Sequence, residues 1–139
     1  MRSRSTARVF RNAWFRKFAR KQRIGDASLC AAVARAEAGL IDADLGGGLI
    51  KQRVARPGEG RSAGYRTVIV YQVGSRAVFV FGFAKKDQGN IEGDDEKDLK
   101  RLAKLLLGFT DEELDRLVAA GKFDEVSCDD EETDQDLPQ

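Results

Sequence analysis

The chain has 139 residues, enough for one compact domain, and its 42% hydrophobic content includes no run of about 18 apolar residues that could span a membrane. The chain has no histidine and only two cysteines, Cys30 and Cys128, which are far apart in the sequence. This composition excludes a conventional zinc site and a Cys/His nucleophile. The net charge of +1 hides an asymmetry: residues 1–66 hold 15 Lys and Arg against 5 Asp and Glu, whereas residues 67–139 hold 9 against 18.

The first element is predicted to be an amphipathic helix. Phe10, Trp14 and Phe18 recur at four-residue steps and form its apolar face, and Gly25 ends it. A short strand at ARVF is the alternative for the first residues. No apolar signal-peptide core follows the basic N-terminus, so we expect a cytoplasmic protein without membrane contact. The opposite helix face is basic and carries Arg11, Arg16, Lys17, Arg20 and Lys21.

A second helix is predicted to follow directly. Asp26 is a plausible N-cap, and Gly39 is a stop signal. Cys30 is expected to be a small buried residue of this helix. The predicted buried stripe consists of Leu29, Val33 and Ala36.

Glycine-rich segments then flank a short strand, LIKQRVA, at residues 49–55. Alternation along this strand places Lys51 and Arg53 on one face together with Leu49. Asp42 and Asp44, which precede it, are interpreted as turn and solubility residues. The strand thus presents two cations on the same side.

A β-hairpin is predicted next, with Gly74 and Ser75 as a type II′ turn between YRTVIVYQV and RAVFVFGFA. Paired residue numbers then sum to 149, so Arg66 lies opposite Phe83. By alternation, Lys85 lies on the same face as Arg66. The second hairpin strand is apolar on both faces and is therefore expected to be central in the sheet.

Two helical patterns follow the strands, and Thr110 with Glu113 forms a capping box at the start of the second. The expected fold is α+β, with two N-terminal helices packed on a small, mainly antiparallel sheet of three to four strands, followed by C-terminal helices. We expect a single domain over residues 1–123 and an acidic, disordered tail over residues 124–139.

Cations converge on one rim if the strand at 49–55 pairs antiparallel with the strand at 65–73. The candidate catalytic residues of this rim are Lys51, Arg53, Arg66, Lys85 and Lys86. Candidate RNA-binding residues are Arg56 and Arg61 in the intervening loop, with Arg20 and Lys21 on the first helix. A basic half of this kind favours a polyanionic partner, although charged residues that merely coat helix surfaces would look the same.

Such a rim is suited to phosphate, because arginine offers a rigid fork for phosphate oxygens and lysine a point charge. Simple binding needs only the charges. RNA cleavage through the 2′-hydroxyl also needs a base and an acid, and without histidine a lysine is the leading candidate base. Arginines would neutralise the developing phosphate charge. No metal or cofactor is expected for this chemistry.

Several separated motifs resemble one known family. LIKQRVA, SAGYRTVIVYQV and VFVFGFAKKD are similar, in order and spacing, to the core of the RelE toxins of bacterial toxin–antitoxin modules. The resemblance implies a ribosome-dependent messenger-RNA endonuclease that a cognate antitoxin holds inactive in a hetero-oligomeric complex. It covers nearly the whole chain up to about residue 126.

The resemblance also implies roles for individual residues. Lys51 and Arg53 stand where the family has two strand lysines, and Arg66 stands at its transition-state arginine. Lys86 aligns with a proposed general acid, whereas the predicted hairpin register favours Lys85, so both remain candidates. Arg53 departs from the family pattern, which has a lysine at this position. Arginine keeps the charge but is a poor proton carrier. No aromatic residue of DQGNIEG matches the tyrosine that stacks on a base in well-known members.

Two other functions remain open at this point. A toxin of the same fold that inhibits DNA gyrase, as ParE does, needs no catalytic lysine. A non-catalytic basic module that binds nucleic acid needs only the charged rim.

Overall fold

The structure is a computed structural model that describes residues 7–56, 60–84 and 93–128. Its elements in chain order are β1 (Arg8–Asn12), α1 (Ala13–Gln22), α2 (Asp26–Glu37), β2 (Ala43–Gly46), β3 (Leu49–Arg56), β4 (Gly60–Gln72), β5 (Arg76–Ala84), α3 (Gly93–Leu107), α4 (Asp111–Ala119) and β6 (Phe123–Val126). No helix in the described ranges is both long and apolar enough to cross a membrane.

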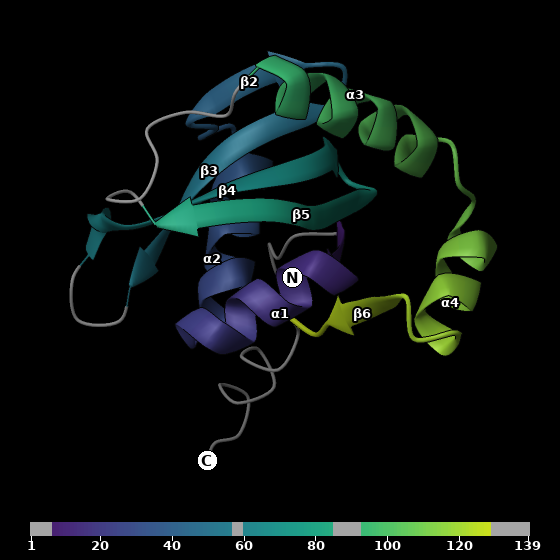
Figure 1. The fold of residues 1–139 in the computed structure, drawn as a ribbon, viewed down its shortest axis with the longest axis horizontal. Helices are drawn as coiled ribbons and strands as arrows, with labels where there is room; N and C mark the ends of the chain where they lie inside the picture. Colours follow the sequence, from purple (N-terminus) through teal and green to yellow (C-terminus); the bar gives the residue numbers. More distant parts are fainter. Residues whose placement is uncertain (1–6, 57–59, 85–92, 129–139) are drawn as a thin grey trace.

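The sheet has the strand order β2-β3-β4-β5-β1-β6, with β1 parallel to β5 and the other neighbours antiparallel. Helices α1 and α2 cover one face, and α3 with α4 packs on the other (Figure 1). The predicted α+β class is confirmed, and so is the central position of β5. The described chain forms six strands, however, rather than three or four. Strands β2 and β6 were not expected, and β1 corresponds to the short strand at ARVF that was the alternative to an earlier helix start.

The N-terminal helix begins later than predicted. Val9 and Phe10 belong to β1, where alternation sends Val9 into the core beneath α1 and α2 and Phe10 into the core beneath α3 and α4. Asn12 caps α1 by accepting a hydrogen bond from the Phe15 N–H at 2.8 Å. Phe10 thus belongs to a strand, and Trp14 and Phe18 belong to the helix that follows it, so their four-residue spacing does not mark a single helix. Phe15 is fully buried, whereas Trp14 is exposed.

The remaining helix ends follow the sequence signals only in part. The first helix ends at Arg23, which has φ 60°, rather than at Gly25, and Gly25 takes the N-cap position predicted for Asp26. The capping box of Thr110 and Glu113 is present. The predicted stripe of α2 is buried at Leu29, Val33 and Ala36.

The turn between β4 and β5 differs from the predicted two-residue turn. Gln72 pairs with Arg76, so three residues connect the strands. Ser75 N–H donates to the Gln72 carbonyl at 3.0 Å, and Gly74 between them has φ 71°, a conformation that glycine adopts without steric cost. The register beside the turn is therefore offset by one residue from the predicted one.

A β-bulge at Val80 removes this offset. Ile69 pairs with Phe79, whereas Val68 pairs with Phe81, so Val80 is an extra residue on β5. Beyond the bulge the pairing returns to the predicted register. Arg66 therefore lies opposite Phe83 as predicted, although two deviations that cancel produce this result.

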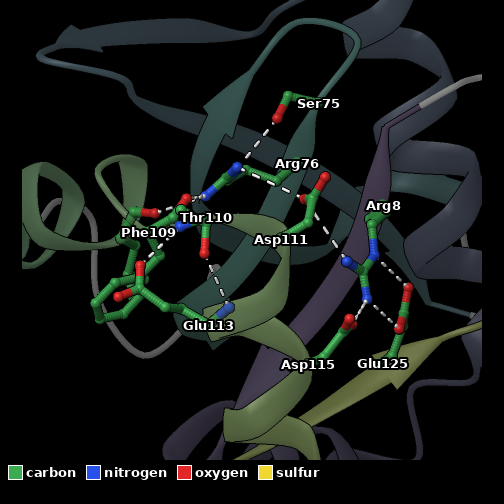
Figure 2. A network of polar contacts seen from close by, with 10 residues as sticks. Arg8, Ser75, Arg76, Phe109, Thr110, Asp111, Glu113, Asp115 and Glu125 are labelled. Atoms are coloured by element: carbon green, nitrogen blue, oxygen red, sulfur yellow. Dashed lines mark hydrogen bonds and ion pairs between the residues drawn. The ribbon is translucent and has the colours of Figure 1, made fainter.

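Two buried or half-buried arginines hold the C-terminal elements against the sheet (Figure 2). Arg76 of β5 is 6% exposed and donates to the Leu106 and Phe109 carbonyls at 3.1 and 2.6 Å, which satisfies the C-terminal end of α3. Arg8 of β1 binds both carboxylate oxygens of Glu125 in β6, at 2.9 and 2.8 Å, and Asp115 of α4 at 2.6 Å. The hydrogen bond with Glu125 raises the pKa of Arg8 further above its ordinary value.

The C-terminal segment is anchored further than the sequence indicated. Asp124 to Val126, expected to begin the acidic tail, belong to β6, and residues 129–139 lie outside the described residues. Cys128, which follows β6, forms a disulfide with Cys30 of α2, with Cα atoms 5.6 Å apart. Cys30, expected to be a small buried residue, is instead half-buried and disulfide-bonded.

The disulfide gives a prediction about stability. It closes a loop of 98 residues, which restricts the unfolded chain, so its reduction should lower the free energy of unfolding by about 2–4 kcal/mol. Urea unfolding with and without a reductant measures this loss. Cys30→Ser should match the reduced protein and should not respond to the reductant. Oxidised and reduced proteins of equal stability would contradict the prediction.

Candidate functional site

The predicted strand cations share one face of the sheet. In the β3–β4 ladder Lys51 pairs with Val68 and Arg53 pairs directly with Arg66. Because paired residues of an antiparallel ladder and every second residue of a strand point to the same side, Lys51, Arg53 and Arg66 project together. We call these three residues the cationic face.

Helix α3 covers only part of this side of the sheet. Leu49, two residues before Lys51, and Val70 are fully buried in the core beneath α3 and α4. A Cβ atom on Gly48 would lie 2.3 Å from Leu107 Cδ1, so the end of α3 packs directly on the β2–β3 turn. The three cations lie farther along the same two strands, away from α3, and are partly exposed. The cationic face is thus a partly exposed continuation of a buried apolar surface.

Arg66 has an incompletely satisfied guanidinium group. Its Nη1 atom is shielded from solvent and has no hydrogen-bond partner among the described residues. Its cross-strand neighbours are Arg53 on one side and Phe83 on the other, and neither side chain offers an acceptor. A buried donor without an acceptor is costly, and the cost is removed when an acceptor such as a phosphate oxygen binds.

Arg53 is paired with a carboxylate. Its Nη2 lies 3.2 Å from Asp42 Oδ1, and its backbone N–H donates to Asp42 Oδ2 at 2.7 Å. Arg35 of α2 approaches the same Oδ2 at 3.4 Å and donates to the Arg53 carbonyl at 2.7 Å. Burial alone would raise the pKa of Asp42, but the hydrogen bonds from the Arg53 backbone and guanidinium outweigh it and hold that pKa below its ordinary value.

Asp42 and Asp44 are both exposed, in keeping with their interpretation as turn and solubility residues, but Asp42 also makes a long-range contact that this interpretation did not include. Asp44 is exposed and accepts a hydrogen bond from the Gly46 N–H at 2.8 Å, within β2 and just before the β2–β3 turn. Asp42 instead contacts a residue eleven positions later in the chain. Sequence reasoning missed this contact because no local motif connects the two residues.

A buried glutamine fixes the backbone that carries Asp42. Gln52 is fully buried and its Oε1 accepts a hydrogen bond from the Asp42 N–H at 2.7 Å. Its Nε2 donates to the carbonyls of Ala32 and Leu40, at 3.0 and 3.2 Å. The carboxylate of Asp42 is consequently held against β3 from both its main chain and its side chain.

Aromatic residues border the cationic face along β5. Phe81 pairs with Val68, and Phe83 pairs with Arg66, so both rings lie on the same side as the cations. Trp14 stacks on Phe81 with ring centroids 4.8 Å apart and remains 44% exposed. The sequence placed Trp14 in the core, and the strand–helix junction at Asn12 explains why it lies at the surface instead.

The remaining predicted residues are not brought onto the cationic face by the described structure. Arg20 and Lys21 are exposed on α1, in the layer behind the sheet. Lys85 and Lys86 lie outside the described residues, immediately after the Tyr65–Ala84 pair at the end of β5. Arg56 and Arg61 belong to the backbone of β3 and β4, and their side chains are not described.

The family model described as "RelE toxin of RelE / RelB toxin-antitoxin system" matches residues 7–126. A search of curated proteins returned no match.

The ion pair of Asp42 gives a prediction about acid stability. Its pKa is lowered in the folded protein, so its charge stabilises the fold above the ordinary value of 3.8, and this contribution is lost as the pH falls through the lowered pKa. At neutral pH, Asp42→Asn should therefore lose about 1 kcal/mol of unfolding free energy. The difference from the wild type should shrink below about pH 4.

Chemical denaturation at neutral and acidic pH measures this difference. Asp44→Asn is the matched control, because it removes the same charge and keeps an acceptor for the Gly46 N–H. It should change little at either pH. A deficit of Asp42→Asn that stays constant down to acidic pH would show that the ion pair is not its source.

Proposed function

The chain belongs to the RelE family, the toxins of RelE/RelB toxin–antitoxin systems, and we propose that it acts by cleaving messenger RNA. It is thus the toxin component of such a module, and the family implies a cognate antitoxin as its partner. The observation that carries the proposed activity is the pairing of Arg53 with Arg66 on a sheet face where both are partly exposed and where a shielded Arg66 Nη1 has no acceptor among the described residues.

The proposed reaction is metal-independent cleavage through the 2′-hydroxyl. The 2′-oxygen of one nucleotide attacks the adjacent phosphorus, and the bond from phosphorus to the 5′-oxygen of the next nucleotide breaks. The products are a 2′,3′-cyclic phosphate and a 5′-hydroxyl. One group accepts the proton of the 2′-hydroxyl, and another donates a proton to the departing 5′-oxygen.

Each residue of the cationic face has a role in this proposal. Arg66 binds the phosphate and neutralises the charge that develops on it, because a fixed guanidinium fork suits phosphate oxygens. Arg53 adds charge without carrying a proton. Lys51 accepts the proton of the 2′-hydroxyl. Lys85 or Lys86, which follow β5 directly, donates the proton to the leaving oxygen.

The basic half of the chain supplies further contacts in this proposal. Cations bind an RNA backbone by releasing its condensed counterions, so they add affinity without sequence preference. The residues assigned to this role are Arg20, Lys21, Arg56 and Arg61. The RNA is messenger RNA on the ribosome in the cytoplasm, and the antitoxin blocks the reaction by covering the cationic face in a hetero-oligomeric complex.

Removal of Arg66 tests the assigned phosphate contact. Arg66→Ala should abolish growth arrest on induction and should slow RNA cleavage by about a hundredfold to a thousandfold, because transition-state charge is no longer neutralised. Arg101→Ala is the matched control, since Arg101 is exposed on α3 and pairs only with Asp98 among the contacts described. It should leave arrest intact. Equal toxicity of the wild type and Arg66→Ala would refute the role of Arg66.

The chemistry of the RNA ends and the effect of a chelator test the reaction itself. Ribosomes programmed with messenger RNA should yield fragments with 2′,3′-cyclic phosphate and 5′-hydroxyl ends. If the ribosomes are first assembled and washed, excess EDTA added with the toxin under conditions that keep them intact should not change the cleavage rate. Intact transcripts accompanied by DNA damage after induction would favour gyrase inhibition instead. A 5′-phosphate on the fragments would exclude attack by the 2′-hydroxyl.

A further inference from the structure

The two opposed arginines of the cationic face differ in their partners. Arg53 and Arg66 are direct neighbours in the β3–β4 ladder, where like charges repel. Asp42 offsets this repulsion by pairing with Arg53. Arg66 has no carboxylate partner among the contacts described. An incoming phosphate therefore meets one cation that is available and one that is already neutralised.

The Arg53 guanidinium can exchange its contact with Asp42 for a contact with phosphate. The Arg53 side chain is 41% exposed, so a phosphate can reach its guanidinium. If the guanidinium leaves, Asp42 still receives the Arg53 backbone N–H at 2.7 Å and Arg35 at 3.4 Å. The carboxylate therefore keeps hydrogen-bond donors. Leaving it without donors would be the main free-energy cost of breaking a partly buried ion pair.

Arg35 is less able than Arg53 to change its ion-pair partner. Its side chain is 19% exposed, and its Nη2 also donates to the Arg53 carbonyl at 2.7 Å. Asp42 itself is immobilised through its N–H by the buried Gln52. Of the three charged side chains in this cluster, Arg53 is the most exposed, at 41% against 25% for Asp42 and 19% for Arg35, so its guanidinium is the group best placed to change partner.

We propose that Asp42 is a positioning residue that competes with RNA phosphate for the guanidinium of Arg53. This inference rests on the proposed RNA-cleaving function. In the free protein Asp42 holds Arg53 in an internal ion pair, and a bound phosphate recruits Arg53 only by displacing this carboxylate. RNA that approaches Arg66 alone gains one contact. Only a phosphate placed between the paired arginines gains both.

Asp42→Asn tests the competition directly. Asparagine keeps an oxygen that accepts the Arg53 N–H but no longer binds the guanidinium by charge. The probe is a 2′-O-methyl RNA oligonucleotide, which lacks the attacking hydroxyl and stays intact. Asp42→Asn should bind it about threefold to tenfold more tightly at low salt. The slope of log Kobs against log salt should steepen by about 0.7, the value for one more phosphate contact on a single strand.

Matched variants separate this effect from the loss of one negative charge. Asp44→Asn removes the same charge from the neighbouring strand β2 and should leave the salt slope unchanged. Arg53→Gln should weaken binding more in the Asp42→Asn background than in the wild type, because Arg53 is then free to bind RNA. A merely structural role of Asp42 would not change the salt slope or this coupling.

The outcomes distinguish the inference from the function on which it rests. If the wild type binds and cleaves RNA but Asp42→Asn binds no more tightly than Asp44→Asn, competition by Asp42 is refuted and the proposed function stands. Weaker binding by folded Asp42→Asn would likewise refute it, because Asp42 would then orient Arg53 toward RNA. If the wild type neither binds nor cleaves RNA, both proposals fail.

Discussion

Two arginines oppose each other on neighbouring strands, and the surrounding structure has to accommodate them. Arg53 and Arg66 are partners in the β3–β4 ladder, so backbone hydrogen bonds keep their charges close. Solvent exposure lowers the repulsion at Arg53, and the Asp42 carboxylate neutralises the charge of Arg53. Arg66 retains a shielded Nη1 without an acceptor among the described residues. The fold therefore tolerates the pair and still leaves a charge for an anionic ligand.

Strand β5, which pairs with the strand that carries Arg66, is packed on both faces. The face behind the arginine pair packs on α1 so closely that a Cβ atom on Gly82 would lie 2.8 Å from the Phe18 ring. On the other face, Arg76 donates to the Leu106 carbonyl at the end of α3 and to the Phe109 carbonyl in the link to α4, and thereby keeps α3 over the apolar end of the sheet. Side chains on such strands keep their spacing better than side chains on loops do. The buried part of the sheet thus sets the geometry of the exposed part.

The sequence predicted the parts of this site that depend on strand alternation. Lys51 and Arg53 share a face, as expected, because a period of two leaves no other choice. The position of Arg66 opposite Phe83 was also right, but only because the bulge at Val80 compensates for the longer turn, and neither feature has a clear sequence signal. Asp42 could not be predicted, since its role depends on contacts between distant segments of the chain.

Arginine at position 53 changes how charge and proton transfer are divided in the proposed reaction. RelE-type toxins resemble this chain but carry a second strand lysine there, which can serve either purpose. A guanidinium remains charged at any physiological pH, so Arg53 contributes charge alone. Proton transfer then falls to lysines, and Lys51 is the one that shares the strand face with Arg53. An internal carboxylate beside an arginine can regulate how much charge reaches the phosphate without altering the residue that moves the proton. Asp42 occupies that position, so in the proposed reaction it would tune RNA binding separately from chemistry.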